Sequence, residues 1–263
     1  MSDIAPLLFV RQLCLKAPTN HTLFEDISFS VYPGQIWAIL GENGAGKTAL
    51  LNTIVGLTPS AAEAIYIAQH PLAESPKTLA TLRAYLPQHP YFPSEQAVFD
   101  TVMNARYPYR SFWQMRYSEE DIVIVENALT QFQLHAQLDK EMMALSGGQQ
   151  QWVALAATWA QDTPLILLDE PITFLDLSRQ HRLFCLIQSA AAHGKALLIS
   201  LQDPNLALQY CTHALCLFKE GDCISGPVAE ILTAETLSRL YHFPMKHITH
   251  ENASYFITDL PRP

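Results

Sequence analysis

The eight residues from Gly41 to Thr48, Gly-Glu-Asn-Gly-Ala-Gly-Lys-Thr, constrain this chain more than any other stretch. They match the pattern G-x-x-x-x-G-K-[ST] in full, between an apolar run at 36–40 and a helix-like segment at 49–55. In that setting the glycines allow a tight turn, so that backbone N–H groups and a helix N-terminus face polyphosphate oxygens. Lys47 adds a positive charge, and the Thr48 hydroxyl can bind Mg²⁺. A glycine-rich turn without a ligand is the plainer alternative, and the full match disfavours it.

A second feature is the apolar run at 165–168, which ends in Asp169 and Glu170. Such a run is typical of a strand that is buried on both faces of a parallel sheet. Carboxylates at its end point into the crevice where such sheets bind ligands. With a phosphate loop upstream, we predict that Asp169 helps to hold Mg²⁺ and that Glu170 activates water. Two merely solvated acids are the alternative.

Apolar runs alternate with helical patterns along most of the chain. The pattern predicts early strands at 7–15 and 27–31, buried strands around 165–168 and 196–201, and a closing hairpin within 215–225. From residue 95 to about residue 140 the pattern is helical, with a capping-box spacing from Ser118 to Asp121. We predict an α/β fold with a mostly parallel core sheet, N-terminal antiparallel strands and an inserted helical lobe.

Two stretches carry little meaning alone. Gln88 follows an apolar run and precedes a proline-rich loop, where a glutamine is usually just solvated. Ser146, Gly147 and Gly148 stand at the start of an amphipathic helix, and such a start can bind an anion. On spacing alone, an ordinary helix cap explains these three residues better.

The overall charge argues against nucleic acid as a partner. Lys and Arg total 16 against 25 for Asp and Glu, and no basic run is present. The aromatic residues from Tyr107 to Tyr117, including Phe112 and Trp113, stand beside three arginines, but a packing or protein-contact surface is favoured. No apolar stretch approaches the roughly 18 residues needed to cross a bilayer, and the N-terminus lacks the basic region of a signal peptide. We expect a soluble, intracellular protein.

The order and spacing of these motifs resemble the ATP-binding cassette subunits of ABC transporters. The resemblance covers nearly the whole chain and rests on GENGAGKT, the glutamine of LPQ, the signature LSGGQ, the strand LILLDEP and Leu175-Asp176. It implies an ABC-type P-loop NTPase fold and the hydrolysis of ATP with Mg²⁺. In that family two cassettes pair head to tail, and ATP lies between the phosphate loop of one copy and the signature of the other.

The resemblance also implies a role for each motif residue. Glu170 polarises the attacking water, Gln88 senses the γ-phosphate and reports to the membrane partner, and Asp176 lies in the loop that couples the two sites. Thr48, Gln88 and Asp169 are the implied metal residues: Thr48 and Asp169 serve Mg²⁺, and Gln88 also senses it. The implied nucleotide contacts are Gly41, Asn43, Gly44, Ala45, Gly46, Lys47 and Thr48, with Ser146, Gly147, Gly148 and Gln149 from the second copy.

Two positions depart from the family pattern. The family commonly has a histidine after the strand that follows the Asp-Glu pair, and here Gln202 occupies that catalytic position. An amide can donate and accept hydrogen bonds but cannot ionise, so we expect slower hydrolysis with dimer closure retained. The aromatic residue that often stacks on adenine is also missing, and His21 or Phe24 could partly replace it.

The helical lobe, the run at 160–164 and the C-terminal run at 240–245 are similar to the importer branch that serves iron chelates, haem and vitamin B12. A molybdate or tungstate importer is the alternative, and a soluble ABC-type ATPase that acts on nucleic acid is a remote one. A regulatory ATP-binding module with little catalysis is a further reading, motivated by Gln202.

The resemblance implies three partners: a second copy in a head-to-tail dimer, an integral-membrane permease and, indirectly, an extracytoplasmic substrate-binding protein. The expected location is cytoplasmic, peripheral on the inner face of the cell membrane. We divide the chain into a nucleotide-binding core (1–92), the helical lobe (93–145), the signature helix with the rest of the core (146–226) and a C-terminal helical segment with a tail (227–263).

Overall fold

The computed structural model describes residues 4–17, 19, 21–59, 64–93, 95–110, 116–251 and 253–259, so Phe112 and Trp113 lie outside the described residues. A six-stranded sheet forms the centre, in the order β10-β9-β3-β8-β7-β6. All its strands run parallel except β10, which pairs antiparallel with β9. The strands are β3 (Ile36–Leu40), β6 (Arg83–Leu86), β7 (Leu165–Leu168), β8 (Ala196–Ser200), β9 (His213–Leu217) and β10 (Cys223–Pro227). The predicted parallel core and closing hairpin are confirmed.

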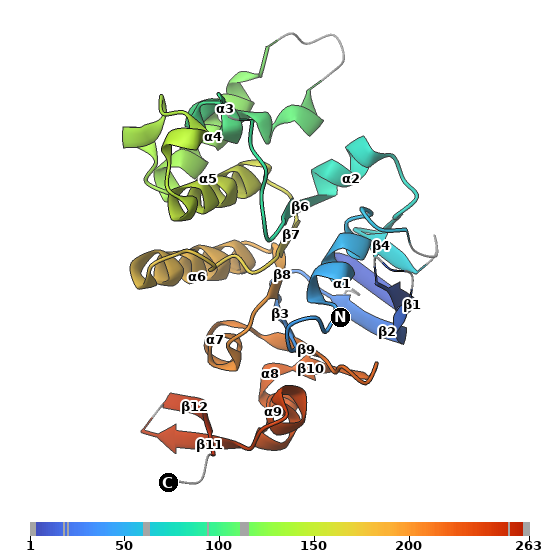
Figure 1. Cartoon of the computed structure of the whole chain (residues 1–263). Helices are drawn as coiled ribbons and strands as arrows, with labels where there is room; N and C mark the ends of the chain where they lie inside the picture. Colours follow the sequence, from blue (N-terminus) through green and yellow to red (C-terminus); the bar gives the residue numbers. More distant parts are fainter. Residues whose placement is uncertain are drawn as a thin grey trace.

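An antiparallel sheet of the order β2-β1-β4-β5 lies beside this core, as predicted for the N-terminal strands (Figure 1). It contains β1 (Leu8–Lys16), β2 (Thr22–Val31), β4 (Ile65–Ile67) and β5 (His70–Pro71). The short helix α2 (Pro76–Leu82) then leads into β6, and the Ser75 hydroxyl caps it by accepting a hydrogen bond from the Thr78 N–H. Strand β2 begins at Thr22, earlier than the alternating run at 27–31 predicts.

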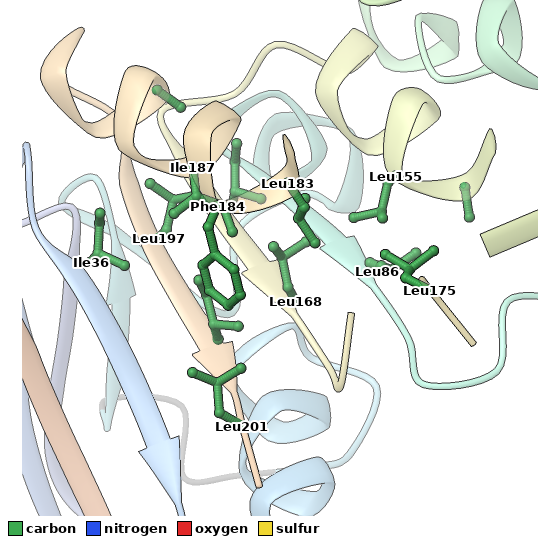
Figure 2. Close-up of a cluster of buried hydrophobic side chains, with 14 of the residues drawn as sticks. Ile36, Leu86, Leu155, Leu168, Leu175, Leu183, Phe184, Ile187, Leu197 and Leu201 are labelled. Atoms are coloured by element: carbon green, nitrogen blue, oxygen red, sulfur yellow. The ribbon is translucent and has the colours of Figure 1, made fainter. Parts of the chain in front are cut away.

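Alternate side chains of the core strands enter two separate hydrophobic clusters, as expected for a sheet that is covered on both faces. The first cluster joins the sheet to α5 (Gly147–Ala160), α6 (Leu177–Ala192) and α7 (Pro204–Tyr210). In Figure 2, Leu183, Phe184 and Ile187 of α6 lie over the strands, close to Leu168 and Leu197. The second cluster joins the other face to α1 (Lys47–Ile54) and the antiparallel sheet.

The predicted helical lobe lies at one end of the core (Figure 1). It contains α3 (Val98–Asn104), α4 (Glu119–Gln131) and the short 3₁₀ turns η1 (Tyr107–Tyr109), η2 (His135–Gln137) and η3 (Met142–Ala144). The capping box at the start of α4 is confirmed, because Ser118 and Asp121 each accept a hydrogen bond from the other's backbone N–H. Arg106 pairs with Asp121 inside this lobe and fastens the lobe to the core by donating to the carbonyl oxygens of Ala160 and Gln161 at the end of α5.

The C-terminal part contains α8 (Val228–Ile231), α9 (Ala234–Tyr241) and an antiparallel hairpin of β11 (Met245–His250) and β12 (Ala253–Thr258). The sequence analysis expects only a tail after α9, so the hairpin is an additional element. Met245 and Ile248 of β11 are half-buried while their neighbours are exposed, and this pattern lacks the period of two by which a strand is recognised. Within the described ranges, no helix has both the length and the apolar character that crossing a membrane requires.

Candidate nucleotide site

The phosphate loop links the end of β3 to the start of α1. Gly44 and Gly46 adopt the left-handed φ values of 83° and 103°, which disfavour any residue with a Cβ. Gly41 is required for a different reason, since a Cβ there would lie 2.8 Å from the carbonyl oxygen of Leu217. Lys47 Nζ donates to the carbonyl oxygens of Gly41 at 2.7 Å and Glu42 at 3.2 Å. The loop therefore curls around the ammonium group of its own lysine.

The charge of Lys47 is set by opposing influences. Burial lowers the pKa of this ammonium group, while the nearby carboxylates of Glu170 and Asp169 act to raise it. Lys47 and Glu170 come from different elements and line one cavity, and such a pair of charges suits a site that neutralises phosphate and holds a cation.

The two carboxylates are fixed by Ser200, a residue that the sequence analysis does not single out. Its hydroxyl donates to Asp169 Oδ1 at 2.6 Å and accepts from the Glu170 N–H at 2.7 Å. Gln88 Nε2 in turn donates to Glu170 Oε2 at 3.1 Å. A serine at the end of the apolar run of β8 is the one signal in the sequence, because a buried hydroxyl needs hydrogen-bond partners.

A cavity of about 450 Å³ collects side chains from several separate segments. The residues that line it are Ala17, His21, Leu23, Asn43, Gly44, Gly46, Lys47, Thr48, Ala49, Gln88, Glu170 and Gln202. Five of the seven phosphate-loop residues assigned to the nucleotide therefore line one cavity with Gln88, Glu170 and Gln202, while Gly41, Ala45 and Asp169 are buried and do not line it. His21 is exposed at the cavity, whereas Phe24 is buried beneath Gly46 and has no free face for adenine.

Asp169 also suits a hard cation. It is fully buried, and its Oδ2 atom has no hydrogen-bond partner within the described part of the chain. Such an atom is costly unless a ligand satisfies it. Thr48 lines the cavity beside Glu170, the residue that follows Asp169, and carboxylate and hydroxyl oxygens are the donor types that Mg²⁺ accepts. The residues present therefore fit the metal that the sequence predicts.

The signature residues lie elsewhere. Ser146 and Gln149 cap α5 reciprocally, and in the described residues none of the signature side chains lines the phosphate cavity. A Cβ on Gly148 would come within 2.5 Å of the carbonyl oxygen of Phe174, but a Cβ on Gly147 would meet nothing within 4 Å. Asp176 caps α6 by accepting from the Arg179 N–H at 2.8 Å. The chain by itself does not bring these residues to the phosphate loop.

Comparison with known proteins decides the family. The model of the ABC transporter family matches residues 24–173, which include the phosphate loop, the signature and the Asp169-Glu170 pair. The chain belongs to the ABC transporter ATP-binding family. Its members' nucleotide-binding fold binds ATP, and the chain is accordingly an ATPase.

Several relatives of this ABC protein have curated names. The achromobactin transport ATP-binding protein CbrD of Dickeya dadantii is 33% identical over 225 residues, which cover 85% of this chain and 83% of the relative. The hemin import ATP-binding protein HmuV of Thermobifida fusca is 33% identical over 230 residues, covering 87% and 80%. A solved structure described as an inward-facing metal-chelate type ABC transporter is 26% identical, with a TM-score of 0.82, and covers 96% of this chain and 97% of that one.

Proposed function

We propose that this chain is the ATP-hydrolysing subunit of an importer for a metal chelate of the iron-siderophore, haem or cobalamin class. The names of the relatives support the cargo class, because achromobactin, hemin and hydroxamate-bound iron(3+) all appear in them. The cavity that gathers Lys47, Thr48, Gln88, Glu170 and Gln202 carries the enzymatic part of the proposal. It supplies the charge and the hydrogen bonds that phosphoryl transfer to water requires.

The chemistry consists of positioning and charge neutralisation. N–H groups of the phosphate loop and Lys47 bind the phosphates, while Thr48 and Asp169 would hold Mg²⁺, which neutralises phosphate charge when bound. Glu170 orients and polarises the attacking water, and Gln88 holds the Glu170 carboxylate through its amide. Gln202 binds the γ-phosphate from the opposite wall of the cavity. His21 contacts the adenine.

A second copy completes the site through its signature. Gly147 has an ordinary backbone and open space around it, so nothing in its own fold requires glycine there. Phe174 and Leu177, which flank Asp176, are 70% and 83% exposed although apolar. Apolar residues exposed together mark a contact surface. A head-to-tail dimer would cover them and bring Ser146, Gly147 and Gly148 to the phosphate held by the other copy.

The permease binds in a groove of about 330 Å³ between the core and the helical lobe. Tyr91 on its rim is 89% exposed, and the neighbouring Phe92 and the prolines at 87, 90 and 93 also line the groove. Pro87 directly precedes Gln88, so a partner in this groove would influence the residue that holds Glu170. We infer a position of the subunit at the inner face of the cell membrane, with the substrate-binding protein on the other side.

Purification of the tagged chain from its native membrane tests this function. We expect the permease to co-purify, and we expect the binding protein encoded with it to retain an iron, haem or cobalt chelate by metal analysis. A bound molybdate or tungstate would support the alternative cargo. A subunit that elutes without any membrane partner would contradict transport.

The groove itself is tested by Tyr91→Asp. This change should abolish recovery of the permease without affecting ATP binding, because the side chain is exposed. Leu57→Asp is the matched control, since Leu57 is 70% exposed and lies outside the groove. Equal recovery with both variants would contradict docking at this groove.

A further inference from the structure

Two consecutive residues at the end of α9 contact the segment after β8 and the phosphate loop. The Tyr241 hydroxyl donates to the backbone carbonyl oxygen of Gln202 at 3.0 Å. His242 Nε2 lies 3.5 Å from Glu42 Oε2, an atom that also pairs with Lys219 Nζ at 2.6 Å. Glu42 belongs to the phosphate loop, and Gln202 lines the phosphate cavity. The end of α9 thus contacts both segments.

Gln202 needs such support because it lies just beyond the sheet. The last hydrogen bond to β3 comes from the residue directly after β8, where the Leu201 N–H donates to the Ile39 carbonyl oxygen. The side chain of Gln202 is exposed at the cavity. Beyond the sheet, the carbonyl oxygen of Gln202 is held by the hydrogen bond that the Tyr241 hydroxyl donates to it.

The following helix is fastened to the same C-terminal part. The Asn205 side chain accepts from the Phe256 N–H at 2.7 Å and donates to the Phe256 carbonyl oxygen at 3.1 Å. Contacts from α9 and β12 therefore lie on both sides of the residue pair 203–204. The C-terminal elements lie at the end of the molecule away from the helical lobe (Figure 1), so they can hold Gln202 without touching the lobe.

Tyr241 is suited to hold a carbonyl oxygen permanently. Burial raises the pKa of its phenol, so the hydroxyl remains a donor at every working pH. The buried side chains of Leu237 and Leu240 anchor its helix, and its ring stacks on Phe243 with centroids 6.0 Å apart. Because its helix is anchored, the Tyr241 hydroxyl can fix the position of the Gln202 carbonyl oxygen to which it donates.

We propose that Tyr241 is a positioning residue for ATP hydrolysis: it fixes Gln202, while the next residue, His242, lies 3.5 Å from Glu42 of the phosphate loop. This inference rests on the proposed role of Gln202 at the γ-phosphate. Tyr241 itself touches neither nucleotide nor water, and its effect passes through the Gln202 backbone. The C-terminal segment after β10 thereby becomes part of the catalytic apparatus.

Tyr241→Phe tests the proposal, because it removes the hydroxyl and keeps the ring. We expect kcat for ATP to fall about tenfold, since displacing a catalytic group by 1 Å can cost about a hundredfold, with KM changed less than about twofold. Tyr117→Phe is the matched control, as it removes a 3.0 Å hydroxyl bond to Asn104 in the helical lobe. Both variants should keep the wild-type melting temperature within a few degrees.

A second pair of variants separates positioning from general stability. In a Gln202→Ala background, Tyr241→Phe should cause no further loss of kcat, because the side chain that it positions is gone. Losses that multiply, or a Tyr241→Phe enzyme with wild-type kcat beside a slow Gln202→Ala enzyme, would overturn the inference. A Gln202→Ala enzyme with full turnover would instead refute the proposed role of Gln202 itself.

Discussion

At the scale of single residues, Ser200 determines whether the two carboxylates of the site keep their positions. Ser200→Ala leaves Asp169 Oδ1 without a donor and the Glu170 N–H without an acceptor. Each unmet buried group costs about 1–3 kcal/mol, so we expect the free energy of unfolding to fall by about 2 kcal/mol or more. We also expect kcat to fall at least about tenfold, because Glu170, the proposed water-activating carboxylate, loses its fixed geometry.

Urea denaturation and steady-state ATPase rates measure both effects of Ser200→Ala. The control is Thr158→Ala, which removes another buried hydroxyl whose bond goes only to the helical carbonyl oxygen of Ala154. That carbonyl retains its helical partner, so the control should differ little from wild type. Unchanged kcat in Ser200→Ala would show that Glu170 is positioned by other contacts.

Gln202 is one of the two positions at which the sequence departs from the family pattern, and its replacement by histidine has a defined outcome. The position lines the cavity and is exposed, so an imidazole fits without disturbing the core. Since general acid–base groups contribute about 10²–10⁴-fold and the amide already supplies hydrogen bonds, we expect Gln202→His to raise turnover about threefold to tenfold. The measurement is ATP turnover in the assembled complex. No increase would mean that Gln202 is already a full substitute.

The two adjacent glycines of the signature should respond differently to replacement by alanine: one variant should lose stability and the other should lose dimerisation. Gly148→Ala forces a Cβ to within 2.5 Å of a backbone oxygen, so we expect a loss of stability of about 1–3 kcal/mol. Gly147→Ala meets no atom within 4 Å and should melt like wild type, yet lose ATP-dependent dimerisation. Thermal melts and light scattering with ATP distinguish the two. A Gly147→Ala protein that dimerises normally would refute the proposed contact.

At the scale of elements, the sequence predicts what is determined locally. Strands β7 and β8 are fully buried, so their apolar runs identify them, and the Ser118–Asp121 spacing identifies the start of α4. The start of β2 at Thr22 is determined by pairing with β1, in which Thr22 lies opposite Lys16. The β11–β12 hairpin likewise forms through its partner strand, and its exposed side chains leave no periodic signal.

The stability of the helical lobe depends on pH through Asp121, which pairs with Arg106 inside the lobe. Burial raises the pKa of this carboxyl, but the hydrogen bonds from Arg106 and Ser118 outweigh burial and hold the pKa below its usual value. A lowered folded-state pKa stabilises the fold above the unfolded-state pKa, and that contribution is lost as pH falls through the folded value. Acid should therefore weaken the lobe.

Asp121→Asn tests this dependence. The variant breaks a buried pair, so we expect it to be about 3 kcal/mol less stable than wild type at pH 7, with the difference shrinking below about pH 4. Urea denaturation at both pH values gives the comparison. Asp162→Asn breaks the more exposed pair with Lys195 and should cost less than about 1 kcal/mol. A gap for Asp121→Asn that stays constant with pH would contradict the assignment.

At the scale of the whole molecule, the chemical groups of the site were predictable and their supports were not. The phosphate loop and the Asp169-Glu170 pair stand in motifs whose residue types state their chemistry. Ser200 and Tyr241 contact their partners across 31 and 39 residues of chain, and no spacing rule links such positions. Only the folded chain brings them together.

The assembly as a whole is tested by trapping it. Glu170→Gln replaces the proposed water-activating carboxylate with an amide of the same shape, so ATP should bind without being hydrolysed. We expect this variant to convert from monomer to dimer when ATP and Mg²⁺ are added, as measured by light scattering. Failure to dimerise would contradict the hydrolytic role of Glu170.

Phe174→Asp locates the contact within that trapped dimer. In the Glu170→Gln background it should prevent dimerisation while ATP binding persists, because Phe174 is 70% exposed beside the signature and does not line the cavity. Tyr91→Asp, an equally acidic change in the permease groove, should leave the dimer intact. If the two surfaces are separate, each variant loses one partner and keeps the other. A Phe174→Asp protein that still dimerises would show that the second copy binds elsewhere.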